Sequence, residues 1–228
     1  MNVSDIIMAF FDFIPVVAYA FGAVLLQRVF YNKMSKGCFA VFSAGTITVI
    51  VAGLLKAIYK LLFVFHITRF DALSQQFFPM QTVGFFLAGA SILALLCFEQ
   101  GKNTVACIAA PAVLTSIVFA YAGNYDDVQP IGKAGTMTFV VLMCLGVVVF
   151  DGGLAVIAAM NKKWVELALF IVALVFTLGM GYLSTKDEMN DWIKEFVNIV
   201  GQGSVLAGAL LFKKHGMADS NVKVSFKK

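Results

Sequence analysis

The chain has 228 residues, of which 61% are hydrophobic and 13% are charged, and its formal net charge is +4. Soluble domains carry about 25% charged residues, so one water-soluble globule could not bury this much apolar surface. The composition therefore argues against a soluble protein and predicts an integral membrane protein. Long apolar runs without period-two alternation favour helices, whose backbone groups hydrogen-bond within the segment, over a barrel.

Seven apolar runs follow one another along the chain. A bilayer core about 30 Å thick requires about 20 apolar residues per helix. We therefore predict an all-α fold, with one domain of seven transmembrane helices over 1–228 and a short basic tail at 213–228. The predicted spans are 6–28, 38–65, 80–98, 104–123, 134–160, 164–184 and 192–212. No basic region precedes the first span, which is predicted to be permanent and not a cleaved signal peptide.

The charges of the connecting segments alternate in sign along the chain. The basic set is Arg28, Lys33, Lys36, Lys102, Lys162, Lys163, Lys213, Lys214, Lys223, Lys227 and Lys228. The other set is Asp5, Arg69, Asp71, Asp126, Asp127, Lys133, Lys186, Asp187, Glu188 and Asp191. The positive-inside rule predicts an external N-terminus and a cytoplasmic C-terminus in a plasma or bacterial inner membrane. Charges at membrane boundaries argue against a nucleic-acid partner and favour contact of the tail lysines with anionic lipid.

A weak internal repeat is visible among the predicted helices. The Leu-Ala-Gly-Ala of 87–90 recurs at 206–209, and Val-Gly at 83–84 recurs at 200–201. The matches predict two parallel units of three helices joined by a linker helix, as in some transporters. Matches this short also arise by chance in membrane helices, which are rich in these residues.

This 3+1+3 layout resembles the sugar-transporting SWEET and PQ-loop proteins in topology, and seven helices with an external N-terminus resemble rhodopsins. The Pro-Gln dipeptide of the PQ-loop family is absent. A retinal-bearing protein needs a lysine midway through the last helix, where this chain has Asn198 and Gln202. No family is therefore assigned.

The last span carries a polar stripe. Its members are Asp191, Glu195, Asn198 and Gln202, whose spacing places them on one helical face. Amides facing hydrocarbon would lack partners, so the stripe is predicted to face the bundle interior, a water-filled cavity or another subunit. It is interpreted either as one wall of an external cavity or as hydrogen-bonding contacts between helices.

Three further polar residues are predicted in the outer half of the bundle: Asp12, Lys56 and Gln81. Asp12 and Lys56 have similar depths on consecutive spans, which usually neighbour each other, so we predict an ion pair between them. Lys60 is predicted to extend toward the interface. Lys56 is interpreted as a ligand for an anion or carboxylate, as a proton-linked switch, or as a paired charge that fixes packing. Pro15 is predicted to kink the first span.

Asp151 is predicted on the inner side of the fifth span, where Gly152 and Gly153 follow it. The two glycines indicate either a locally unwound helix or close backbone approach. The carboxylate is a candidate proton or cation site. The structural alternatives are an ion pair with Arg28 or Lys162, or a neutral acid.

These residues predict a permease for a small polar or anionic solute. The candidate solute-binding residues are Asp12, Lys56, Gln81, Glu195, Asn198 and Gln202. The alternatives are a membrane-embedded enzyme acting on a lipid-like substrate, and a sensor or accessory subunit. No nucleophile motif or zinc-ligand spacing is present, so no catalytic residue, metal or cofactor is predicted. The expected partners are membrane lipids and the solute, with a homo-oligomer or a partner membrane subunit as further options.

Overall fold

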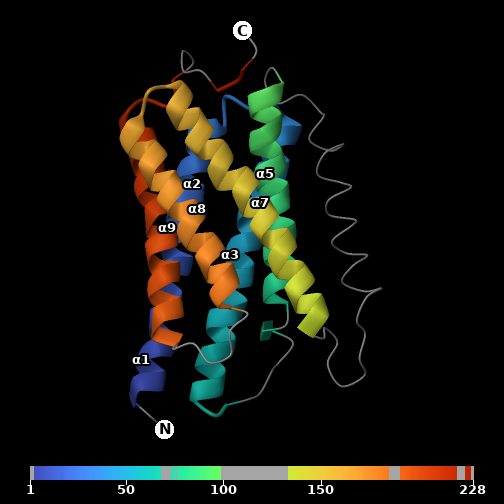
Figure 1. Ribbon diagram of the computed structural model, residues 1–228, viewed down its shortest axis with the longest axis vertical. Coiled ribbons are helices and arrows are strands. Elements are labelled where there is room, and N and C mark those ends of the chain that lie inside the picture. The colour runs from blue at the N-terminus through green and yellow to red at the C-terminus, as the bar shows by residue number, and fades with distance from the viewer. Residues whose placement is uncertain are drawn as a thin grey trace.

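The computed structural model describes residues 3–67, 73–74, 76–98, 133–184, 191–219 and 224–226, which form helices and connecting turns without a strand (Figure 1). The helices are α1 (Val3–Phe11), α2 (Phe13–Phe30), α3 (Lys36–Val64), α5 (Phe77–Cys97), α7 (Lys133–Met160), α8 (Trp164–Leu183) and α9 (Asp191–Lys214). Within the described residues, six stretches are long and apolar enough to cross a membrane, and α1 and α2 together supply the first, Ile6–Phe30. These stretches correspond to six of the predicted spans. The predicted fourth span, 104–123, lies outside the described residues.

The first span is interrupted at Asp12, between α1 and α2. Pro15 has no amide hydrogen to donate to the carbonyl of Phe11, and its ring crowds that carbonyl in a regular helix. The Asp12 amide still donates to the Met8 carbonyl at 3.1 Å, so the chain keeps its direction through the break. The first span is therefore irregular near Pro15, as predicted, and the break in the helix lies at the buried residue Asp12.

Helix α7 is continuous through Gly152 and Gly153, so the predicted local unwinding is wrong. Gly153 instead permits close packing, because a Cβ there would overlap the side chain of Ile92 on α5. This is the second of the two interpretations that the sequence left open. A Cβ at Gly152 would meet nothing within 4 Å.

The helices from α2 to α9 form a closed ring in chain order, in which α9 returns to α2 (Figure 1). Successive described helices mostly run antiparallel, as expected for short connections. Two neighbouring pairs run parallel. On α5 and α7, Thr82 donates to the carbonyl of Phe139 at 2.9 Å, and Ile92 lies against Gly153 further along. On α2 and α9, Gly22 lies against the backbone of Leu206.

The C-terminal end of the bundle is closed by packed residues from the predicted tail. Met217 is fully buried beyond the end of α9. Lys33 donates to the carbonyl of Asp219 at 2.5 Å, and the amide of Phe226 donates to the carbonyl of Leu96 at 2.9 Å. Burial lowers the pKa of Lys33, and the charge of Asp219 acts in the opposite direction.

The backbones of α3 and α5 approach each other closely at Gly45. An added Cβ at Gly45 would lie 2.6 Å from the Ala88 amide nitrogen and 2.7 Å from the Gly84 carbonyl oxygen, both of which are backbone atoms. Backbone atoms cannot move aside as a side chain can, so the helices would have to separate.

We expect Gly45→Ala to lower the free energy of unfolding by about 1–3 kcal/mol, the usual cost of overpacking. Gly152→Ala is the matched control, because its Cβ enters open space and alanine favours a helix by up to about 1 kcal/mol over glycine. Thermal unfolding in detergent micelles compares the two. Equal midpoints for both variants would contradict the close contact.

Candidate functional site

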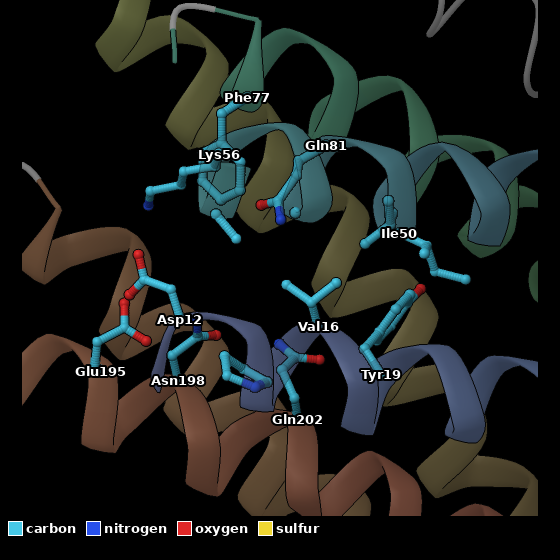
Figure 2. A pocket seen from close by; sticks show the side chains of 14 residues that line it. Asp12, Val16, Tyr19, Ile50, Lys56, Phe77, Gln81, Glu195, Asn198 and Gln202 are labelled. Carbon is cyan, nitrogen blue, oxygen red and sulfur yellow. The ribbon is translucent and has the colours of Figure 1, made fainter. Parts of the chain in front are cut away.

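A cavity opens between α2, α3, α5 and α9, toward the end of the bundle where the chain begins (Figure 2). It holds about 480 Å³ of space free of protein atoms, counting its mouth. Its lining contains Asp12, Pro15, Val16, Tyr19, Val49, Ile50, Gly53, Lys56, Ala57, Phe77, Gln81, Glu195, Asn198 and Gln202. All six residues predicted to bind a solute are in this lining, so the structure brings them together around one space.

Lys60 forms the ion pairs at the mouth of the cavity. Its Nζ lies 2.5 Å from Asp12 Oδ2 and 3.5 Å from Glu195 Oε1. The Lys60 side chain is 30% exposed, whereas the Asp12 and Glu195 side chains are 5% and 6% exposed. One partly exposed cation thus serves two buried carboxylates from different helices.

The predicted ion pair between Asp12 and Lys56 is therefore wrong, because Lys60 takes that place. Side chains on a helix lean toward its N-terminus. Helix α3 begins at the opposite end of the bundle, so the side chain of Lys60 leans inward from the mouth, while Asp12 at the start of α2 leans outward. The two inclinations shift the pairing by one turn, from Lys56 to Lys60.

Lys56 lines the cavity one turn before Lys60 on α3, with its Nζ 4.1 Å from the centre of the Phe77 ring. A cation over an aromatic face is attracted by the ring quadrupole, by about 0.5–2 kcal/mol depending on desolvation. Within the described part of the chain, Lys56 forms no ion pair. It is a cavity cation whose charge is not neutralised by direct contact with a carboxylate.

Amide side chains occupy the middle of the cavity. Gln81 extends from α5, and Asn198 and Gln202 extend from α9 on the opposite side (Figure 2). The Oε1 atom of Gln202 is buried and has no hydrogen-bond partner among the described residues. The predicted polar stripe faces the cavity through its three inner members. Asp191 lies at the exposed end of the stripe and pairs with Lys194 at 3.1 Å.

Tyr19 is a cavity residue that the sequence analysis missed. It lies at the opposite end of the cavity from Asp12 and Glu195 (Figure 2). It is 3% exposed, and its hydroxyl has no hydrogen-bond partner among the described residues. Its position two turns after Asp12 places both on one helical face, which is the signal that could have identified it.

Asp151, the candidate proton or cation site, lies outside the cavity lining. It is 1% exposed, and its Oδ1 has no hydrogen-bond partner in the described chain. The suggested ion pair with Arg28 or Lys162 is not among the ion pairs of the described residues. Phe150, the residue before Asp151, contacts Phe85, and Phe85 contacts Tyr19, with ring centroids 6.0 Å apart in each pair. The sequence placed Asp151 apart from the outer group, and these rings link its position on α7 to Tyr19 at the inner end of the cavity.

No group of three or more His, Cys, Asp or Glu side chains among the described residues is arranged to hold a metal ion. Comparison with known proteins finds no matching family model, no matching curated protein and no matching solved structure. The chemistry of the site must therefore be derived from its own residues.

We expect Lys60→Met to lower the free energy of unfolding by about 3–5 kcal/mol, because it leaves two buried carboxylates without their cation. Lys194→Met is the matched control and should cost no more than about 1 kcal/mol, because its partner Asp191 is exposed. Unfolding of the purified protein in mixed micelles measures both. Adding Asp12→Asn and Glu195→Gln to Lys60→Met should restore most of the loss, and a lack of rescue would show that the lysine acts through packing alone.

Proposed function

We propose that the protein is an integral membrane permease that takes a small polar or anionic solute from the external side. One observation carries the proposal: polar side chains from four helices converge on a single cavity open toward one end of the bundle. Buried polar groups cost free energy when they lack partners. A site with unpartnered atoms such as Gln202 Oε1 is understandable if a polar molecule supplies the missing hydrogen bonds.

The direction of the helices supports seven spans. Helices α5 and α7 run parallel, so α5 ends at the end of the bundle opposite to the one where α7 begins. The chain must return between them, and we assign that return to the predicted span 104–123. The alternating loop charges then orient the N-terminus outside, so the cavity opens to the exterior of a plasma or bacterial inner membrane.

The contacts also support two related three-helix units, α2–α3–α5 and α7–α8–α9. Gly22 on α2 approaches the backbone of α9, and Gly146 on α7 approaches the backbone of α5 in the same way. Gly84 on α5 packs against α3, and Gly201 on α9 packs against α8. Gln81 and Asn198 each lie three residues before these last two glycines. Equivalent positions of the two units thus supply amides to the same cavity.

The lining indicates the chemistry of the solute. Lys56 offers a positive charge, and the three amides offer both donors and acceptors. We propose that Lys56 holds a negatively charged or strongly polar group, that Gln81, Asn198 and Gln202 bind the remainder, and that the cluster of Asp12, Lys60 and Glu195 forms the entrance.

Membrane lipids are the proposed partners of the outer surface. Large apolar side chains on several helices are exposed in the structure. Examples are Val141, Val165, Val175 and Phe196, which are 56%, 61%, 58% and 64% exposed. Many exposed large apolar side chains would be unfavourable in water and favourable against acyl chains.

Uptake by the purified protein in liposomes tests the proposal, with radiolabelled phosphate, succinate, glutamate and glucose as probes. We expect accumulation of at least one probe above the level in empty liposomes. If that probe is an anion, Lys56→Ala should reduce its uptake about tenfold or more, because a hydrogen bond to a charged group contributes about 1.5–3 kcal/mol. Gln202→Ala should also reduce uptake.

The matched control is Lys36→Ala, which removes an exposed lysine at the other end of α3 and should leave uptake unchanged. Uptake that is equal in the wild type, Lys56→Ala and Gln202→Ala would exclude the cavity as the solute path. A signal no higher than in empty liposomes for every probe would contradict the proposed solute class.

A further inference from the structure

We propose that Asp151 binds the proton that couples to solute movement, and that Tyr19 carries this proton between the cavity and Asp151. The inference rests on the proposed permease function. It adds a second ligand, a proton, and a residue, Tyr19, that the solute site does not require.

Burial and missing partners mark Asp151 as unusual. Its side chain lies in the apolar centre of the bundle beside Phe150 and Leu154, which are fully buried. Its Oδ1 accepts no hydrogen bond from the described residues. A carboxylate isolated among apolar groups is costly, whereas the neutral acid is much less so. The Asp151 side chain can therefore switch between a charged and a neutral form by losing or gaining a proton.

Among the described residues, the helices packed against α7 supply no compensating charge. Helix α5 contains no Asp, Glu, Lys, Arg or His, and the one such residue of α8, Glu166, contacts His215 at the C-terminal end of the bundle. On α7 itself, the described titratable neighbour is Cys144, which packs against Gly181. Ring contacts connect this region to Tyr19 on α2: the Tyr19 ring centroid lies 6.0 Å from that of Phe85, which lies 6.0 Å from that of Phe150, the residue before Asp151. Among the described residues, Tyr19 is thus a titratable cavity residue in the direction of Asp151.

Tyr19 is suited to a proton relay because it lies between the cavity and the apolar region that contains Asp151. It lines the inner end of the cavity, and its buried hydroxyl has no partner in the described chain. In the transfer, the tyrosine oxygen accepts a proton from a hydronium ion in the cavity while its own O–H proton passes to the Asp151 carboxylate. The products are water, unchanged neutral tyrosine and a neutral Asp151. A side-chain rotation or one bridging water completes the path, because the two groups are not hydrogen-bonded in this conformation.

Infrared difference spectroscopy of the full-length protein in liposomes tests the inference without any solute. Buffer exchange between acidic and alkaline pH, in H₂O and then in D₂O, reports protonated carboxyl groups through their C=O stretch. We expect a band in the wild type that shifts in D₂O, is lost in Asp151→Asn, and moves in frequency in Asp151→Glu. Glu195→Gln is the matched carboxyl control and should leave this band in place.

Tyr19→Phe should keep the Asp151 band but slow its exchange with D₂O by about a hundredfold or more, the lower end of the range for a positioned proton-transfer group. Tyr31→Phe, which removes an exposed tyrosine hydroxyl at the other end of α2, should leave the rate unchanged. A band that persists in Asp151→Asn, or that never exchanges in the wild type, would overturn the proton site. An unchanged rate in Tyr19→Phe would overturn the relay. If Asp151→Asn does not fold, the band shift in Asp151→Glu makes the assignment.

These outcomes separate the inference from the permease proposal. A proton band assigned to Asp151, without uptake of any probe, would leave the proton site standing and reject the solute class. Uptake that is equal in the wild type and Asp151→Asn at all pH values would reject the coupling and leave the permease standing.

Discussion

The ring of helices closes where the first and last spans meet, and that closure depends on Lys60. Asp12 and Glu195 approach each other from α2 and α9, and two buried carboxylates so close would repel without a cation between them. Lys60 enters from α3 and satisfies both. Further along the same pair of helices, Gly22 allows direct backbone contact with Leu206. The contact between α2 and α9 is therefore stabilised by ion pairs at the mouth of the cavity and by a close apolar contact further along the helices.

The cavity ends where aromatic packing begins. Beyond Tyr19, the rings of Phe30, Phe42, Phe85 and Phe150 contact one another and fill the centre of the bundle. At the C-terminal end, the Glu166–His215 contact and the packed tail add a second layer of closure. The cavity lining is thus polar toward the end where the chain begins, and packed rings close the space beyond Tyr19.

Much of the site was predictable from local periodicity. The spacing of Glu195, Asn198 and Gln202 was enough to place them on an interior face, and Pro15 was enough to predict the break beside Asp12. The lysine that pairs with Asp12 depends on how side chains incline on neighbouring helices, and this was not predictable. For that reason the partner of Asp12 was misassigned. The nearness of Tyr19 to Asp151 joins helices that are distant in sequence, and a single sequence carries no signal for their relative register. The position of span 104–123 stays a prediction.

In the proposed permease, Lys60 forms a short and a long ion pair. The two ion pairs differ in the three-helix units that they connect. Lys60 and Asp12 both belong to the unit α2–α3–α5, and they lie 2.5 Å apart. Glu195 belongs to the unit α7–α8–α9, and its oxygen lies 3.5 Å from the same lysine. Rocking of one unit against the other would keep the first contact and break the second, because only the second crosses between units. The same motion would act on the parallel contact between α5 and α7, which is the other boundary between the two units. Asp151 belongs to α7, so a motion that opens the entrance would also move the helix that carries the proposed proton site.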